Sequence, residues 1–336
     1  MDGFTTLAAR LRPLDGVRLW ANAPMAPFTT IGTGGKAGLL VTVRSAEALA
    51  AVLAAVEEAG VDWFSLGAGS NLLVADRGYK GVVIKLDDCF QYVEGLPAKG
   101  GAVGGEAETE RKPVELEVGA AAFLARLAAV VAEAGLSGME HACGIPGTIG
   151  GGVAMNAGAY GWCMRDVLRG IQVVSAERVC WTAPEDLVWG YRHCGLPPRS
   201  MVTAVRIALT PAECAEVLEC QRGYLRRRRE KQPRSVRTFG STFKNPPGNH
   251  AGRLVEAAGL KGMRHGGAEI STVHGNFLVN LGDATTADVL ALMVLMRQGV
   301  ERVSGITLEP EVRLLGAAFP WDSHGDRASG QPAADG

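Results

Sequence analysis

Hydrophobic residues follow two different spacings in the first part of the chain. Leu39 to Val43 form an apolar, β-branched run, which is typical of a buried strand. After Ser45, hydrophobic residues recur every three or four positions, and this repeat ends before Gly60. Such a spacing places them on one face of a helix, with Ser45 as its N-cap. The pattern therefore predicts a strand at 39–43 and a helix at 46–59.

The same two patterns recur along the rest of the chain. Short apolar runs predict strands at 63–66, 81–86, 114–118, 171–174 and 202–208. Helices are predicted at 120–134, which stops at Gly135, and at 287–303, where Thr285 and Asp288 have the spacing of a capping box. Mixed helices and strands of this kind indicate an α+β or α/β fold.

Composition limits the possible functions without naming one. The chain has 336 residues, 47% of them hydrophobic and 21% charged, and this length is usual for two or three domains. The net charge of −1 argues against general binding to nucleic acids or anionic membranes. Residues 1–16 lack an apolar leader, and the longest apolar run, 289–296, is shorter than the ~20 residues of a membrane span. We expect a cytoplasmic protein with no membrane, nucleic-acid or obligate protein partner.

Cysteines and histidines are dispersed along the chain. None of the seven cysteines has a C-x-x-C partner, which zinc and redox sites commonly need. The six histidines are equally scattered. We therefore expect reduced, mostly buried thiols and no structural metal.

Two glycine-rich stretches could approach an anion closely. The first is Gly67-Ala68-Gly69-Ser70-Asn71, and the second, 144–152, begins Gly144-Ile145-Pro146-Gly147-Thr148. Their glycines permit positive φ and leave N–H groups uncovered, which suits a phosphate or diphosphate. Neither is a Rossmann fingerprint, because Leu72 stands where the third glycine should fall, and the chain has no P-loop. Each stretch could equally be a tight turn without a ligand.

The composition changes at about residue 221, where we place a domain boundary. From there to residue 244 the chain has nine basic residues and a single acidic one, Glu230. Guanidinium and ammonium groups beside the turn at Gly240-Ser241 suit a diphosphate. The segment could instead be a solvated helix face, with Ser241 an ordinary turn residue.

Glu311 follows Pro310 and precedes an apolar, strand-like run. This setting holds a carboxylate rigidly and can partly desolvate it, so that it serves as an acid or an electrostatic element. An ordinary surface-strand carboxylate is the alternative.

Taken in order, these stretches resemble the UDP-N-acetylenolpyruvoylglucosamine reductase family. The matching residues are 30–35 (TIGTGG), 66–71 (LGAGSN), 144–151 (GIPGTIGG), 155–161 (MNAGAYG), 191–192 (YR), 240–246 (GSTFKNP) and 308–313 (LEPEVR). The resemblance extends from about Pro24 to Gly316, and its specificity comes from the ordered set rather than from any one motif. The short stretch between Pro246 and Arg253 is similar to the shorter subclass of the family.

The resemblance implies an α+β fold with an FAD-binding region of the vanillyl-alcohol-oxidase type and a C-terminal α/β substrate-binding domain. The FAD-binding region would span 20–220, with subdomains at about 20–86 and 87–220, and the substrate-binding domain would span 221–316. By composition, 317–336 would be a disordered tail and 96–112 an exposed insertion. The implied reaction is reduction of UDP-N-acetylglucosamine enolpyruvate to UDP-N-acetylmuramate by NADPH through non-covalent FAD, in peptidoglycan precursor synthesis.

The resemblance also implies roles for individual residues. Gly67 to Asn71 and Gly144 to Thr148 would hold FAD. Arg192 would neutralise the substrate carboxylate and the developing oxyanion, Ser241 would protonate the α-carbon, and Glu311 would orient the intermediate or assist protonation. The residues that would bind the substrate are Tyr191, Arg228, Lys231 and Asn245, with the basic segment on its diphosphate.

Some residues depart from the family pattern. Cys194 stands where a serine is common, and Trp162 and Cys163 replace the more usual small and acidic residues. None of these changes removes a proposed catalytic group.

Two alternative functions are also compatible with the sequence. A flavin oxidase or dehydrogenase for an alcohol or sugar would share the FAD-binding region, but would not need Ser241, Glu311 and the basic segment together. A non-catalytic protein that binds nucleotide sugars or RNA would use the arginines and the glycine stretches without flavin.

Overall fold

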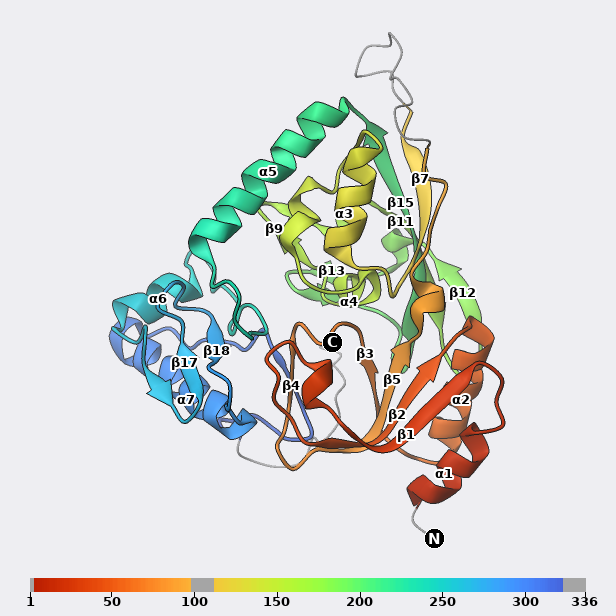
Figure 1. Cartoon of the computed structure of the whole chain (residues 1–336), viewed down its shortest axis with the longest axis horizontal. Coiled ribbons are helices and arrows are strands. Elements are labelled where there is room, and N and C mark those ends of the chain that lie inside the picture. The colour runs from red at the N-terminus through yellow and green to blue at the C-terminus, as the bar shows by residue number, and fades with distance from the viewer. Residues whose placement is uncertain (1–2, 98–111, 323–336) are drawn as a thin grey trace. The chain divides into compact units, whose positions relative to one another are not determined.

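The computed structural model describes residues 3–97 and 112–322 (Figure 1), so nearly all of the predicted insertion at 96–112 lies outside the described residues. The chain forms two compact units. The first comprises residues 1–19, 41–67 and 84–228, and the second comprises residues 20–40, 68–83 and 229–336. Each unit is therefore assembled from segments that are far apart in the sequence.

The first unit contains an antiparallel sheet of strand order β12-β11-β15-β7-β6, of which Figure 1 labels β12, β11, β15 and β7. Its strands are β6 (Val93–Glu94), β7 (Val114–Gly119), β11 (Leu168–Val174), β12 (Val179–Thr182) and β15 (Met201–Pro211), and β8 (Leu136–Ser137) pairs with the end of β15. The short helix α4 (Ile149–Ala154) packs against β15 and β7, and α3 (Leu124–Glu133) packs against β8 and the 3₁₀ turn η4 (Glu140–Gly144). The strands predicted at 114–118, 171–174 and 202–208 are confirmed as parts of β7, β11 and β15.

A second sheet has the strand order β1-β2-β5-β3. Its strands are β1 (Val17–Pro24), β2 (Lys36–Val43), β3 (Trp63–Leu66) and β5 (Tyr79–Leu86). These bounds confirm the strands predicted at 39–43, 63–66 and 81–86. Helix α2 (Ala46–Glu58) has the predicted N-cap, because the Ser45 side chain accepts a hydrogen bond from the Ala48 amide at 3.1 Å. Helix α1 (Gly3–Leu11) packs against α2.

Helix α3 begins at Leu124, four residues after its predicted start. The carbonyl of Ala120 instead accepts from the Gly150 amide at 2.9 Å, and that of Ala122 accepts from the Ile149 amide at 2.8 Å. Pairing with the second glycine-rich stretch therefore replaces the first helical turn. Helical spacing alone could not reveal this tertiary contact.

The basic segment lies largely on helix α5 (Cys214–Lys231), which continues through the boundary predicted at residue 221. The chain passes from the first unit to the second between Arg228 and Arg229.

Other short elements are the strands β9 (Gly158–Ala159), β10 (Trp162–Cys163), β13 (Trp189–Gly190) and β14 (His193–Cys194), and the 3₁₀ turns η1 (Ala26–Phe28), η2 (Asp88–Phe90), η5 (Met164–Asp166) and η6 (Pro184–Asp186).

The second unit combines helices with small sheets. Strands β16 (Arg264–His265), β17 (Ala268–Ile270) and β18 (Leu278–Asn280) are antiparallel, whereas β4 (Leu72–Val74) and β19 (Arg313–Leu315) are parallel. Helix α6 (Ala251–Ala257) packs against α7 (Thr286–Ser304), which in turn packs against β17. Helix α7 confirms the predicted helix at 287–303. Its predicted capping box is also present, with Thr285 and Asp288 each accepting from the other's amide.

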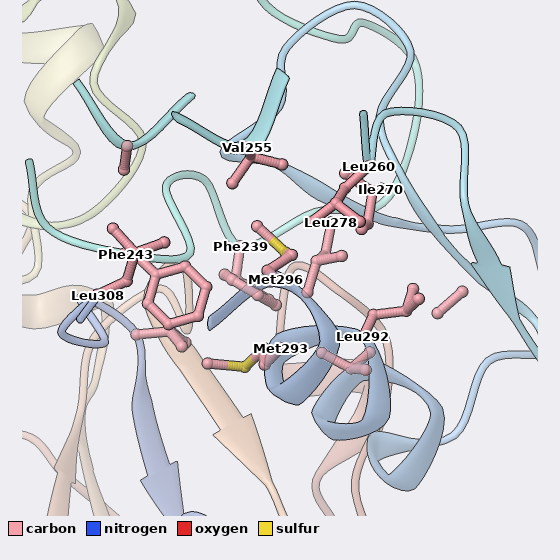
Figure 2. Packing of buried hydrophobic residues seen from close by; sticks show 14 of the residues in the cluster. Phe239, Phe243, Val255, Leu260, Ile270, Leu278, Leu292, Met293, Met296 and Leu308 are labelled. Atoms are coloured by element: carbon pink, nitrogen blue, oxygen red, sulfur yellow. The ribbon is translucent and has the colours of Figure 1, made fainter. Parts of the chain in front are cut away.

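One hydrophobic core fills the second unit. Figure 2 shows Met293 and Met296 of α7 with Phe239 and Phe243, and all four side chains are buried. Burial of a side chain of this size stabilises a fold by about 1.5–3 kcal/mol. Phe239 and Phe243 flank Ser241 in sequence, so the core anchors the chain on both sides of the predicted proton donor.

Residues 317–322, predicted as part of the disordered tail, pack against this core instead. The rings of Phe319 and Trp321 stack 5.0 Å apart with an interplanar angle of 5°. Trp321 also lies 6.3 Å from the Phe243 ring and 5.2 Å from the guanidinium of Arg297. The two aromatic side chains have enough apolar surface to order a segment that is otherwise poor in hydrophobic residues. The tail beyond Asp322 lies outside the described residues.

All seven cysteines are free, but the prediction that most are buried is wrong. Only Cys194 is buried, whereas Cys89 and Cys220 are exposed and the others are intermediate. In the described part of the chain, no group of three or more His, Cys, Asp or Glu side chains could hold a metal ion. No helix within those residues combines the length and the apolar character of a membrane span.

Candidate active site

The turn between β3 and β4 is shaped by two glycines. Gly69 has a φ of +65°, and a Cβ there would overlap the carbonyl oxygen of Phe28. A Cβ at Gly67 would lie 2.7 Å from the Thr148 Oγ1. Neither position has room for a side chain, because neighbouring protein atoms occupy the space that a Cβ would fill, so both positions require glycine.

The second glycine-rich stretch, which lies in the first unit, also contains a backbone conformation that requires glycine. Gly147 has a φ of +132°, which strongly favours glycine, and its carbonyl accepts from the Leu124 amide at 3.0 Å. The Thr148 side chain accepts from the Gly151 amide at 3.4 Å. The segment is therefore held by the Gly147 carbonyl, by the Thr148 hydroxyl and by the Ile149 and Gly150 amides that donate to Ala122 and Ala120.

Several amides of the two stretches are free to bind a ligand. Across residues 3–97 and 112–322, no hydrogen bond uses the amides of Gly147 and Thr148 in the first unit, or those of Ala68 and Gly69 in the second. Uncovered amides beside glycines are the donors that phosphate and diphosphate groups need. Both stretches thus fit the diphosphate of a dinucleotide cofactor such as FAD.

Tyr191 and Arg192 form the tip of the β13–β14 hairpin, in which Gly190 pairs with His193. Arg192 has a φ of +58°, a left-handed conformation that usually costs a non-glycine residue about 1–3 kcal/mol. Its guanidinium lies 4.9 Å from the centroid of the Tyr191 ring, and its Nη2 donates to the Gly158 carbonyl at 3.1 Å. The strained turn and these contacts hold the guanidinium at a defined position.

Asn156 supports this hairpin, although no sequence pattern predicts a role for it. Its Nδ2 donates to the Gly190 carbonyl at 3.0 Å, and its Oδ1 accepts from the Arg165 amide at 3.2 Å. It is buried and has a φ of +38°, which asparagine tolerates better than most residues. An asparagine inside the motif 155–161 is the sequence signal that could have found it.

The second unit brings Ser241 and Glu311 into one hydrogen-bonded arrangement. Ser241 forms a β-bridge with Phe277, and the carbonyl of the next residue, Thr242, accepts from the Glu311 amide at 2.9 Å. The side chain of Asn71 donates to the Glu311 carbonyl at 3.0 Å. Asn71, predicted to contact the cofactor, thus also fixes the backbone of the predicted catalytic glutamate.

The residues predicted to bind the substrate are distributed over both units. Tyr191 and Arg228 belong to the first unit, and Lys231 and Asn245 to the second. The Asn245 Oδ1 accepts from the Ala251 amide at 3.0 Å, which ties this residue to the start of α6. Lys231 is an exposed residue at the end of α5.

Arg228 contacts the second glycine-rich stretch within the first unit. Its Cδ lies so close to Gly144 that a Cβ there would overlap it. Burial lowers the pKa of Arg228, and this shift is opposed by Tyr160 and Cys143. The structure therefore places a predicted substrate ligand directly beside a predicted cofactor segment.

Comparison with known proteins decides the family. Residues 37–178 match the model of the FAD binding domain, and residues 232–315 match the C-terminal domain of UDP-N-acetylenolpyruvoylglucosamine reductase. The UDP-N-acetylenolpyruvoylglucosamine reductase of Myxococcus xanthus (strain DK1622) is 42% identical over 316 residues, which cover 93% of this chain and 97% of that protein. The chain belongs to the UDP-N-acetylenolpyruvoylglucosamine reductase family.

Further members of the reductase family agree with this assignment. That of Anaeromyxobacter sp. (strain Fw109-5) is 45% identical, covering 91% of this chain and 92% of its own length. The crystal structure of the Thermus caldophilus reductase is 37% identical, with a TM-score of 0.73, and covers 89% of this chain and 98% of that one. The predicted fold class, an FAD-binding region with a C-terminal domain of this family, is confirmed, and the chain is an FAD-dependent oxidoreductase.

Trp162, one of the departures from the reductase pattern, lies in an aromatic cluster. It is parallel to the His141 ring, 6.3 Å away, and His141 Nε2 lies 2.6 Å from the Tyr224 hydroxyl. The Trp162 Nε1 and His141 Nδ1 are buried without a hydrogen-bond partner in the described part of the chain. Burial lowers the pKa of His141, against the opposing charges of Glu140 and Asp166.

Cys194, the second residue that departs from the family pattern, has an unreactive thiol. It is buried opposite Trp189 in the β13–β14 hairpin, and burial raises its pKa to about 12. The thiol therefore stays neutral at physiological pH and behaves as a small apolar side chain.

Proposed function

We propose that this protein reduces the enolpyruvyl ether of UDP-N-acetylglucosamine to UDP-N-acetylmuramate, with NADPH as electron donor, in the cytoplasm. Family membership and the FAD-binding region support the reaction type. FAD, when bound, supplies the hydride transfer from NADPH to the enolpyruvyl group. The observation that carries the assignment of residues is the hydrogen bond between the Glu311 amide and the Thr242 carbonyl, because it fixes the backbone of the proposed carboxylate against the residue next to the proposed proton donor.

The two glycine-rich stretches bind the cofactor through backbone donors. The amides of Ala68 and Gly69, and separately those of Gly147 and Thr148, support the binding of phosphate oxygens, because they have no partner among the described residues. The chain supplies hydrogen bonds and not a covalent link, so acid precipitation should release the flavin.

Arg192 carries the positive charge of the proposed reaction. Accepting a hydride leaves the enolpyruvyl group with negative charge beside its carboxylate, and a preorganised guanidinium stabilises that charge. The left-handed backbone of Arg192 and its bond to Gly158 support this role, because they fix the group before substrate arrives.

Ser241 then delivers a proton to the α-carbon of the substrate. Glu311 orients the intermediate or assists this protonation. The β-bridge of Ser241 with Phe277 and the hydrogen bond between Glu311 and Thr242 support a fixed spacing between the two backbones. Fixed spacing matters because proton transfer requires a donor within hydrogen-bond reach of the accepting atom.

The substrate diphosphate is bound by the basic residues around Lys231, with Arg228 beside the glycine-rich stretch. Charge-assisted hydrogen bonds from such groups suit phosphate oxygens. Tyr191 and Asn245 contact other parts of the substrate. The alternative, an alcohol or sugar oxidase, has no use for Ser241 and Glu311 in one arrangement.

Replacement of Ser241 tests the proposal through the two half-reactions. Ser241→Ala should bind FAD and be reduced by NADPH at nearly the normal rate, since protonation of the α-carbon follows that step. Reoxidation by the enolpyruvyl substrate should fall by about 10²–10⁴-fold, the usual contribution of general acid catalysis. Stopped-flow absorbance of the flavin measures both steps. Ser241→Cys should keep more activity than Ser241→Ala, and a mild, equal loss in both steps would show that Ser241 only shapes the turn.

A further inference from the structure

One buried asparagine holds the segment that follows Ser241. Asn276 is 3% exposed, and its Oδ1 accepts from the Phe243 amide at 3.0 Å while its Nδ2 donates to the Phe243 carbonyl at 2.8 Å. Its own carbonyl accepts from the Thr242 amide at 2.8 Å. A single residue thus makes three hydrogen bonds to the two residues next to the proposed proton donor.

Glu311 lies along the other edge of the segment formed by Thr242 and Phe243. The Thr242 carbonyl accepts from the Glu311 amide at 2.9 Å, and Phe243 forms a β-bridge with Pro310. Thr242 and Phe243 therefore lie between Asn276 on one side and the segment of Pro310 and Glu311 on the other. A shift of this short segment would move Ser241 relative to Glu311.

Asparagine suits this position because its side chain offers both a donor and an acceptor. It completes the pairing of Phe243 as the backbone of a neighbouring strand would. Phe243 is fully buried, so its amide and carbonyl could not turn to water if Asn276 were lost. Aspartate lacks the donor, and an aliphatic side chain lacks both groups.

Asn276 is itself fixed by His274. The Asn276 amide donates to His274 Nδ1 at 3.1 Å, and the imidazole lies edge-on to the Phe277 ring with centroids 4.9 Å apart. A Cβ at Gly252 would come within 2.7 Å of the imidazole, so α6 packs closely against it. The asparagine therefore acts from a rigid support.

We propose that Asn276 is a positioning residue that sets Ser241 relative to Glu311 during protonation of the substrate. This inference rests on the proposed role of Ser241. Asn276 touches neither substrate nor cofactor in this scheme, and it acts only through the backbone of residues 242 and 243.

Asn280 provides a matched control in the same unit. It is also buried, and its side chain donates to the Ile31 carbonyl at 2.9 Å and accepts from the Gly282 and Ala284 amides at 2.8 and 3.1 Å. None of these bonds involves residues 241–244. Asn280→Ala therefore removes a comparable set of buried hydrogen bonds without releasing the segment of Ser241.

The test compares Asn276→Ala and Asn280→Ala in both half-reactions by stopped flow. Asn276→Ala should slow reoxidation by substrate about 10- to 100-fold, because a misplacement of about 1 Å can cost 10²-fold, and leave flavin reduction by NADPH near the normal rate. Asn280→Ala should lower the thermal midpoint without this selective loss. Reoxidation at the normal rate in folded Asn276→Ala, or parallel losses in both steps, would overturn the inference. If Asn276→Ala does not fold, Asn276→Ser, which keeps a smaller polar group, is measured in its place.

A double variant separates this inference from the role of Ser241. In the Ser241→Ala background, Asn276→Ala should add almost nothing to the loss in reoxidation, since the group that it positions is gone. Fully additive losses would show that Asn276 acts independently of Ser241 and would contradict the inference. Normal reoxidation in Ser241→Ala alone would instead refute the proposed function.

Discussion

Gly69 and Gly60 adopt nearly the same left-handed backbone, with φ of +65° and +62°, but differ in their surroundings. A Cβ at Gly69 would overlap the Phe28 carbonyl, whereas a Cβ at Gly60 would meet nothing within 4 Å. Gly60→Ala should therefore cost only the strain of the conformation, about 1–2 kcal/mol. Gly69→Ala must also displace the turn, so we expect it to lose FAD. Flavin absorbance after gel filtration checks this, and equal flavin content in the two variants would contradict it.

The residues proposed to act directly are easier to identify from sequence than those proposed to position them. Ser241 and Glu311 lie in stretches that resemble the family, so the sequence indicated them before the structure placed them together. Asn156 and Asn276 act through hydrogen bonds to residues 34 and 33 positions away. Such contacts exist only after folding, and a single buried asparagine has no periodic pattern that would indicate them.

Helix α7 begins at a carboxylate from a distant part of the chain. The two oxygens of Asp76 accept from the Thr286 and Ala287 amides at 2.9 and 2.8 Å, in addition to the capping box. A carboxylate at a helix N-terminus pairs with free amides and with the helix dipole. Asp76→Ala should therefore destabilise the protein by about 0.5–2 kcal/mol.

Urea unfolding of Asp76→Ala measures this loss. Asp62→Ala is the control, because Asp62 is exposed and no hydrogen bond of its side chain is found within the described residues. Its effect should stay within about 0.5 kcal/mol. Equal effects of the two changes would show that Asp76 contributes nothing specific to α7.

Elements stabilised by local sequence were predicted well, and those set by tertiary contacts were not. Helix α2 and the strand β3 match their predicted residues closely, because spacing and a cap define them. The start of α3 shifted because Ala120 and Ala122 pair with the glycine-rich stretch. Residues 317–322 are ordered because the rings of Phe319 and Trp321 pack against the hydrophobic core of the second unit. The composition of this segment could not show that contact.

Each unit contains a partly buried histidine that should make the whole molecule sensitive to acid. Burial lowers the pKa of His141 in the first unit, and burial together with Lys261 lowers that of His274 in the second. The folded protein therefore binds fewer protons than the unfolded chain once the pH falls below about 6.5, the usual histidine value. Stability should be intact above that pH and should fall as the pH drops through the lowered values.

Thermal unfolding between pH 7.5 and 5 measures this dependence. His141→Phe and His274→Phe should each flatten the decline, because each removes one group that must stay neutral in the folded state. Carboxylates such as Asp288, whose pKa is lowered by bonds to the Thr285 backbone, act in a more acidic range. A decline that neither replacement changes would assign the acid sensitivity to other groups.

The parallel pair of β4 and β19 delays completion of the second unit during synthesis. Asn71, next to β4, bonds to Glu311, next to β19, across 240 residues. The ribosome releases β4 long before β19 has been synthesised. The backbone of β4 therefore lacks its pairing partner while the more than 200 residues between them are made. Closing so long a loop is also entropically costly and slow. A nascent chain can therefore acquire the arrangement of Ser241 and Glu311 only after Glu311 has been synthesised, and a chain cut before Glu311 lacks it.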